Sequence, residues 1–298
     1  MRVNYEEKTF EIFFNMEISN KLSACFPLGQ ALEGFLGADF VAMSSSVSLS
    51  KIITGDPFLL YYCKGATLEE IIDIKKTFLT TKSIHKLNSI YMGLINKLPP
   101  MKSNLLFQYK KPEYMLTANA LEWDAWNQPY YRYDLYDGDT FQHSTLVELS
   151  EKLVNIAKVV YASPAISSIN ELIDSYNNKN LLNETNFTDV SNLKGHGRNT
   201  YIKSGYNSIA CSEYTKVESI PVDKLNKNYN SKKFNNNCDY IIYFSSTLEE
   251  SMKNTYLYEA YKSLNQNNYE YHNFKLLYAM SKINNCLLIL GLRWLLLF

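Results

Sequence analysis

The sequence has no cysteine or histidine pattern of the kind that builds a disulfide framework or a zinc site. Its cysteines are odd in number and scattered, and no two of them form a CxxC pair. This predicts a reducing compartment, the cytoplasm, and argues against structural zinc. The histidines are equally dispersed, so there is no HExxH motif. The cysteines are Cys25, Cys63, Cys211, Cys238 and Cys286, and the histidines are His85, His143, His196 and His272.

The chain also lacks an excess of charge of either sign. Thirty basic and thirty acidic side chains give a formal net charge of zero. Proteins that bind polyanions usually carry a basic excess, because neutralising phosphates supplies much of their affinity. Neutrality argues against strong autonomous binding to nucleic acid, but it leaves room for a local basic groove or for a partner that delivers the substrate. The first residues, MRVNYEEKTFEIFF, are acidic where a secretory signal would be basic and then apolar, so no secretion is expected.

Apolar runs long enough to cross a membrane are missing as well. The longest candidate, CLLILGLRWLLLF at 286–298, is only about thirteen residues, whereas a spanning helix needs about twenty. We therefore expect no membrane span and a buried terminal strand or helix, in preference to a membrane or partner anchor. Nucleotide-binding Walker and GxGxxG loops, a Ser-His-Asp elbow and a kinase signature are also missing.

The sequence does show strand-like and helix-like segments in alternation. Such alternation indicates an α/β layered domain. We predict strands at 58–63, 105–110, 130–136, 159–163 and 240–244, and helices at 16–36, 67–98, 145–157, 166–178 and 248–283. The helical region 67–98 begins with a capping box, Thr67 to Glu70. The Asn- and Lys-rich stretches 176–190 and 225–238 are predicted to be loops.

Four polar residues stand where a metal site could form. Glu33 lies near the end of a predicted helix and Asp39 enters a strand six residues later, in ALEGFLGADF. Gln108 and Lys110 are two residues apart on the predicted strand LLFQYK, so both point to one face. Two carboxylates and an amide oxygen are hard ligands of the kind that Mg²⁺ or Mn²⁺ prefers. A lysine beside them can stabilise negative charge as a phosphodiester is attacked.

This set of residues resembles the PD-(D/E)XK nuclease superfamily, in a branch where Gln-x-Lys replaces Glu-x-Lys. The resemblance covers roughly residues 16–165 and implies that Glu33, Asp39 and Gln108 hold the metal and that Lys110 is catalytic. It also implies that the strands of Asp39 and Gln108 are neighbours in one sheet. Two features depart from the pattern: no proline precedes Asp39, and 69 positions separate Asp39 from Gln108.

The expected fold follows from the resemblance. It is a restriction-endonuclease-like mixed sheet flanked by helices, with the helical region 67–98 as an insertion. Residues 1–185 would form this core, and 186–298 a C-terminal α+β extension, either separate or part of the same domain.

A second group of residues interleaves aromatic and basic side chains and is a candidate for binding nucleic acid. A packed lid over the core is the alternative for the aromatic members. His143 begins a predicted helix and could be a general base or a structural histidine, and the basic stretch around His196 could contact phosphate or form a hairpin turn. The candidates are Lys111, Trp123, Trp126, Arg132, His143, His196 and Arg198.

The function that the resemblance implies is a metal-dependent nuclease cleaving nucleic acid, with DNA as the expected substrate, in a defence or restriction-like system. Mg²⁺ or Mn²⁺ would be the cofactor, and a homo-oligomer or a protein partner is expected. The alternative is a catalytically inactive subunit with the same fold that serves binding or assembly. A third hypothesis is an α/β scaffold unrelated to nucleases.

Overall fold

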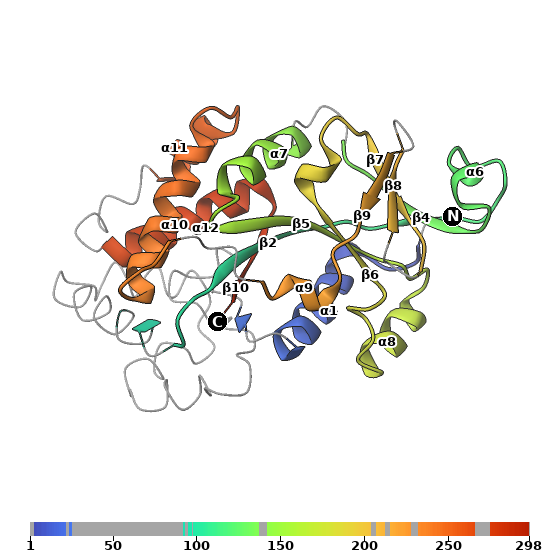
Figure 1. The fold of residues 1–298 in the computed structure, drawn as a ribbon, viewed down its shortest axis with the longest axis horizontal. Coiled ribbons are helices and arrows are strands. Elements are labelled where there is room, and N and C mark those ends of the chain that lie inside the picture. Colours follow the sequence, from blue (N-terminus) through green and yellow to red (C-terminus); the bar gives the residue numbers. More distant parts are fainter. Residues whose placement is uncertain are drawn as a thin grey trace.

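The computed structural model describes residues 3–21, 24–25, 92, 95, 96, 98–136, 142–203, 207–211, 215–227, 232–265 and 275–297 (Figure 1). Glu33 and Asp39, the predicted strand at 58–63 and most of the predicted helical region 67–98 lie outside these residues.

A mixed sheet with helices on both faces forms the centre of the described structure (Figure 1). Its strand order is β1-β10-β2-β5-β6, and only β2 and β5 run parallel. The strands are β1 (Ala24–Cys25), β2 (Ser103–Tyr109), β5 (Ala157–Pro164), β6 (Thr185–Asp189) and β10 (Arg293–Leu297). The expectation of an α/β fold with a mixed sheet is therefore confirmed.

The helix α7 (Gln142–Leu153) directly precedes β5, the parallel partner of β2, and packs on it. All seven residues of β2 are buried, as expected for a strand that is covered on both faces. This explains why the sequences of β2 and β5 read as short, nearly continuous apolar runs rather than as an alternation of apolar and polar residues.

Alternate side chains of β2 enter two separate cores. Leu105, Phe107 and Tyr109 pack with Phe10 and Phe14 of α1 (Glu7–Lys21) on one face. The opposite face of the sheet is covered by α7 and by the C-terminal helices. The remaining helical segments are α6 (Trp123–Trp126), α8 (Ile169–Asn177), η1 (Val190–Leu193), α9 (Val222–Leu225), α10 (Asn237–Met252), α11 (Tyr258–Asn265) and α12 (Lys275–Leu290).

The C-terminal segment 286–298 ends in a buried strand, as the sequence predicts. After α12 the chain turns at Gly291, whose φ of +64° favours glycine, and enters β10. Leu295 is fully buried, and β10 lies between β1 and β2 in the central sheet. The last strand of the predicted extension thus belongs to the same sheet as β2.

A smaller antiparallel sheet packs against the carboxyl half of β5. Its order is β3-β4-β7-β8-β9. Tyrosines make the contact: the rings of Tyr133 and Tyr161 are 5.7 Å apart, and the hydroxyl of Tyr201 donates to Ser163 Oγ at 2.7 Å. The strands are β3 (Glu113–Met115), β4 (Tyr130–Asp134), β7 (Arg198–Tyr201), β8 (Asn207–Ala210) and β9 (Thr215–Glu218).

Three expectations from the sequence are wrong. The helix expected at 16–36 is not formed as predicted, because α1 spans Glu7–Lys21 and Ala24–Cys25 form the strand β1. Residues 240–244 are not a strand but part of α10, whose first turn is capped by Asn236 accepting from the Asp239 N–H at 2.9 Å. The stretch 176–190 is not all loop, because it contains β6.

Both edges of β2 are occupied by described strands. From Ser103 to Phe107 it is paired with β10 and, from Asn104, with β5 on its other edge. The predicted strand that carries Asp39 lies outside the described residues.

Candidate functional site

Gln108 and Lys110 lie at the carboxyl end of β2, on the face that α7 covers. Gln108 pairs with Tyr161 of the parallel strand β5, and Lys110 Nζ lies 5.8 Å from the centroid of the Tyr161 ring, so both side chains are on the Tyr161 side. The backbone N–H of Lys110 donates to the Ala162 carbonyl at 3.0 Å and keeps Lys110 in the extended ladder. Gln108 is 9% exposed and Lys110 7%. Carboxyl ends of parallel strands are common ligand positions in α/β sheets.

The side-chain amide of Gln108 meets the start of α7 and the turn between α12 and β10. Gln142 Nε2 donates to Gln108 Oε1 at 3.2 Å and to the Leu290 carbonyl at 2.8 Å. With its amide rotated by half a turn, Gln108 instead donates to the Gly291 carbonyl at 2.9 Å and to the Leu290 carbonyl at 3.3 Å. A Cβ at Gly291 would approach Gln142 Nε2 to 3.1 Å, which explains the glycine.

The two amide orientations bear on whether Gln108 fits a divalent cation. In the rotated form backbone carbonyls hold the amide nitrogen, and the oxygen turns away from Leu290 and Gly291. An amide oxygen is a hard donor of the type that Mg²⁺ accepts. Gln108 therefore fits as one ligand, and the other two expected ligands, Glu33 and Asp39, lie outside the described residues.

His143, in the first turn of α7, is buried and fully hydrogen-bonded. Its Nε2 lies 2.9 Å from the Leu193 carbonyl and its Nδ1 lies 2.9 Å from the Tyr161 hydroxyl. Burial lowers the pKa of His143 below its ordinary value, and the nearby Lys110 lowers it further, although the Leu193 carbonyl opposes both. At neutral pH the ring is uncharged. Its contacts are those of a structural histidine.

Acidic residues of α1 and its preceding residue lie near the other face of the same strand end. The Glu7 carboxylate accepts from the backbone N–H of Lys111 and lies near Lys110, and burial still raises the pKa of Glu7 above its ordinary value. Lys111 Nζ forms an ion pair with Glu6 at 3.3 Å. Neither Glu6 nor Glu7 was among the residues that the sequence singled out, because only the fold brings α1 to the end of β2.

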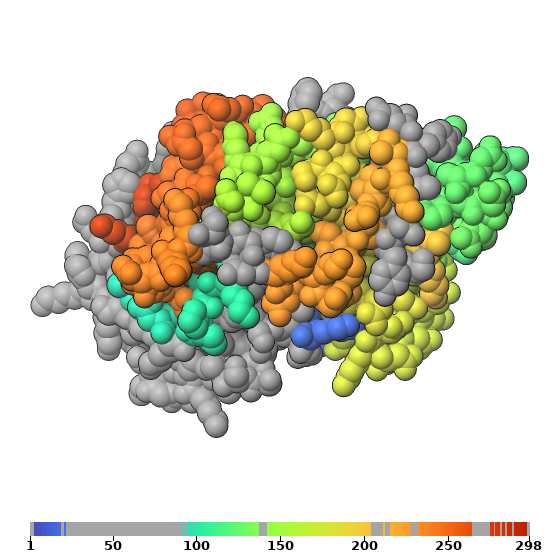
Figure 2. Space-filling model, viewed as in Figure 1, coloured from blue at the N-terminus to red at the C-terminus, as the bar shows by residue number. Residues whose placement is uncertain are grey.

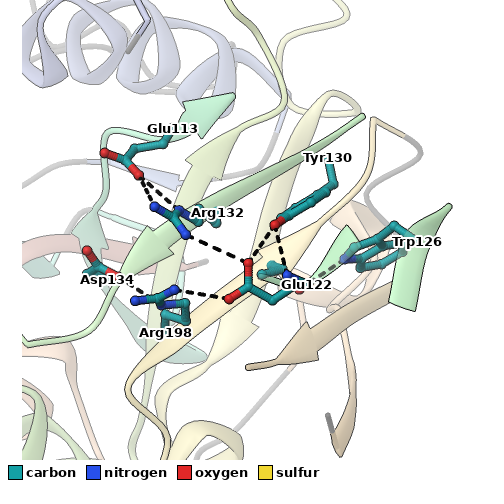
Figure 3. A network of polar contacts seen from close by, with 8 residues as sticks. Glu113, Glu122, Trp126, Tyr130, Arg132, Asp134 and Arg198 are labelled. Atoms are coloured by element: carbon teal, nitrogen blue, oxygen red, sulfur yellow. Dashed lines mark hydrogen bonds and ion pairs between the residues drawn. The ribbon is translucent and has the colours of Figure 1, made fainter. Parts of the chain in front are cut away.

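Arg132 and Arg198 are held in a network around the buried Glu122 (Figure 3). Arg198 Nη1 donates to Glu122 Oε1 at 3.0 Å, and Arg132 Nη1 lies 3.7 Å from Glu122 Oε2. The Tyr130 hydroxyl donates to the same Oε2 at 2.5 Å. Other nitrogens of the two guanidinium groups contact further carboxylates: Arg132 Nη2 lies 2.8 Å from Glu113, and Arg198 Nε lies 3.2 Å from Asp134.

This network has more acidic than basic groups. Three carboxylates face two guanidinium groups, so the arginines are engaged by the protein itself and their charge is compensated. The arrangement attaches the segment around α6 to the small sheet. In the space-filling view this segment forms a projection at one end of the molecule (Figure 2).

Trp123 and Trp126, both in α6, are partly buried. The indole N–H of Trp126 donates to Thr200 Oγ1 at 3.1 Å, which ties it to β7. This contact is typical of a packed lid, the alternative that the sequence left open.

The basic stretch around His196 forms a turn between η1 and β7. Gly195 has a φ of +80°, and the backbone N–H of His196 donates to the Leu193 carbonyl at 3.1 Å. His196 itself is buried. Lys194 forms an ion pair with Glu151 at 2.6 Å and Lys203 one with Glu184 at 3.4 Å. These cations are therefore distributed over separate acidic partners rather than gathered into one patch.

Among the described residues, no three His, Cys, Asp or Glu side chains gather closely enough to hold a metal ion. Within the same residues, no helix has both the length and the apolar character that a bilayer crossing requires. Comparisons of the chain with family models, curated proteins and solved structures found no match.

Proposed function

We propose that this protein is a metal-dependent nuclease whose site lies at the carboxyl end of β2. One observation carries the proposal: Gln108 and Lys110 stand together, buried and on one face, at the end of a strand whose parallel partner directly follows α7. An amide oxygen and an ammonium group at this place offer a ligand for a hard cation and a positive charge for a phosphate.

In this proposal Glu33, Asp39 and Gln108 would hold Mg²⁺ or Mn²⁺. The ion, when bound, would stabilise negative charge that develops on the phosphate. Lys110 would bind a non-bridging phosphate oxygen or orient the attacking water, because its ammonium group has three donors and no acceptor. The Gly291 and Leu290 carbonyls would hold the Gln108 amide in the orientation that presents its oxygen. The low exposure of Gln108 and Lys110 would strengthen these interactions by excluding bulk water.

DNA is the substrate that we propose, in a defence or restriction-like role. This part rests on analogy with the uses of restriction-endonuclease-like folds. A zero net charge and internally paired arginines leave little basic surface among the described residues, so a homo-oligomer or a protein partner would complete the DNA-binding surface.

A second candidate function, a catalytically inactive binding or assembly subunit, is favoured by one contact. In the first amide orientation the Gln108 oxygen is already occupied by Gln142. A glutamine that serves only to join β2 to α7 would need no metal, and Lys110 would then be a buried structural cation.

The test is cleavage of DNA by the purified chain with Mg²⁺ or Mn²⁺. The parent should cleave, Lys110→Met should lose activity by about 10²-fold or more, and Asp39→Ala should lose it as well, while circular dichroism shows unchanged folding. Lys158→Met is the matched control, because Lys158 lies near the start of β5 and forms an ion pair with Asp189 at 2.8 Å, and its activity should stay within a few-fold of the parent. If the parent is folded but does not cleave DNA with either metal, the nuclease function is wrong, and the inactive binding or assembly subunit remains as the proposed function.

A further inference from the structure

We propose that His143 and Tyr161 are positioning residues that fix the ammonium group of Lys110. The inference rests on the proposed function, because it assigns a task to residues next to that site. These three side chains come from α7, β5 and the end of β2, and only the fold brings them together.

The direction of the two hydrogen bonds of His143 follows from its partners. A carbonyl oxygen can only accept, so Nε2 carries the proton and donates to Leu193 O at 2.9 Å. In a neutral ring Nδ1 is then an acceptor, and the Tyr161 hydroxyl donates to it at 2.9 Å. Because both side chains are about 1% exposed, water does not compete for these bonds.

These bonds determine where the Tyr161 ring lies. Its backbone is fixed by the pairing of Tyr161 with Gln108, and its hydroxyl is fixed by His143. The ring is thus held at both ends, and it lies 5.8 Å from Lys110 Nζ, inside the range of about 6 Å for attraction between a cation and an aromatic ring. A lysine side chain has four rotatable bonds, so a fixed neighbour of this kind restricts where its charge resides.

Packing alone does not account for the hydroxyl and the imidazole. A phenylalanine at position 161 would fill almost the same volume and would need no buried partner. The hydrogen bond between Tyr161 and His143 fixes the orientation of the ring and adds almost no volume. A fixed ring helps to hold the Lys110 ammonium group at the correct distance from a phosphate oxygen, because a displacement of about 1 Å can cost about 10²-fold in rate.

The first readout is steady-state cleavage by the full chain with Mn²⁺. Tyr161→Phe keeps the ring and removes the bond to His143, and His143→Phe removes the same bond from the other side. Both should lower kcat by about tenfold to a hundredfold and leave KM within about twofold, because binding of DNA does not require a fixed Lys110. Tyr240→Phe is the control, since Tyr240 is also a buried tyrosine but bonds Asn104 near the opposite end of β2.

The second readout does not depend on cleavage. In protein labelled with ¹³C at lysine Cε, the ε-methylene protons of Lys110, assigned through Lys110→Arg, should resonate upfield of those of Lys111 because of the Tyr161 ring current. The signal should move fully toward the Lys111 position in Tyr161→Leu and partly in Tyr161→Phe and His143→Phe.

The outcomes separate the two proposals. If the parent cleaves and the variants keep its kcat, or if the Lys110 signal is the same in Tyr161→Phe as in the parent, the positioning role is wrong and the nuclease function stands. If the parent does not cleave, the nuclease function fails, and the Lys110 signal alone decides whether His143 and Tyr161 fix this side chain.

Discussion

At position 122 a fully buried carboxylate accepts hydrogen bonds from a guanidinium group, a phenol and a thiol. Burial by itself raises the pKa of Glu122, but the hydrogen bonds from Cys211, Tyr130 and Arg198 outweigh it, and the pKa lies below its ordinary value. Glu122 is therefore ionised, and its charge compensates that of Arg132 and Arg198. Its effect is to hold the segment around α6 on the small sheet.

Replacing this carboxylate should therefore destabilise the fold. We expect Glu122→Gln to cost about 1–3 kcal/mol of unfolding free energy, because two partly buried guanidinium groups lose a charged partner. Urea denaturation followed by circular dichroism measures this loss. Glu113→Gln is the control: the Glu113 side chain is 38% exposed and pairs with Arg132 at the surface, so its loss should stay below about 1 kcal/mol.

The same residue predicts a dependence on pH. The pKa of Glu122 is lower in the folded state than its ordinary value of 4.5, so its contribution to stability is complete above pH 4.5 and disappears as the pH falls through the folded-state pKa. The difference in melting temperature between the parent and Glu122→Gln should accordingly shrink below pH 4.5. A difference that grows on acidification would mean that Glu122 is not stabilised as a carboxylate.

At the scale of single elements, β10 covers one edge of β2 in the central sheet. It pairs with β1 on one side and with β2 on the other, and Leu295 packs beneath it into the core with Phe107. Removal of β10 would expose one edge of the strand that carries Gln108. An exposed edge of this kind is a template for aggregation.

Two variants test this role. Deleting 291–298 should give aggregated or dissociated protein on size-exclusion chromatography. Leu295→Ala, a milder change at a fully buried position, should cost about 2–5 kcal/mol in urea denaturation, whereas Val154→Ala, at a position that is 62% exposed, should change stability by less than about 0.5 kcal/mol. A soluble deletion variant with an unchanged melting temperature would contradict the account.

Local sequence was enough to locate β2, β5 and α7, because β2 and β5 are short, nearly continuous apolar runs and the apolar residues of α7 recur at helical spacing. It was not enough for residues 240–244, where five apolar residues fit a strand or a buried helix equally well. The helix forms because the buried side chains Tyr240, Ile241, Phe244 and Leu248 recur at helical spacing over a longer stretch. The position of β10 between β1 and β2 depends on pairing between distant segments, which no local pattern contains.

At the scale of the whole molecule, part of the candidate site could be predicted from local sequence, and part of it depends on tertiary packing. Gln108 and Lys110 could be placed at one strand end from their spacing alone. Their relation to Gln142, His143 and Tyr161 could not, because these residues meet only after α7 has packed on β5.

Charge at position 108 should govern metal affinity. Gln108→Glu would add an anionic ligand of the same length, so Mn²⁺ should raise the melting temperature of this variant more than that of the parent. Lys110→Met should keep a metal-dependent shift, since the lysine is proposed to serve the phosphate rather than the ion. Differential scanning fluorimetry across a Mn²⁺ titration measures both, with Mn²⁺-free samples as the reference. If Mn²⁺ changes the melting temperature of neither the parent nor the two variants, the metal site is excluded.

The most direct measurement of the central claim is a crystal structure of the chain soaked in Mn²⁺, with data collected at an energy where manganese scatters anomalously. The account predicts one strong anomalous peak within about 2.0–2.3 Å of the Gln108 amide oxygen, with the amide nitrogen turned to the Gly291 carbonyl and with Asp39 as a second ligand. A map without a peak there, in which the Gln108 oxygen still accepts from Gln142, would contradict it.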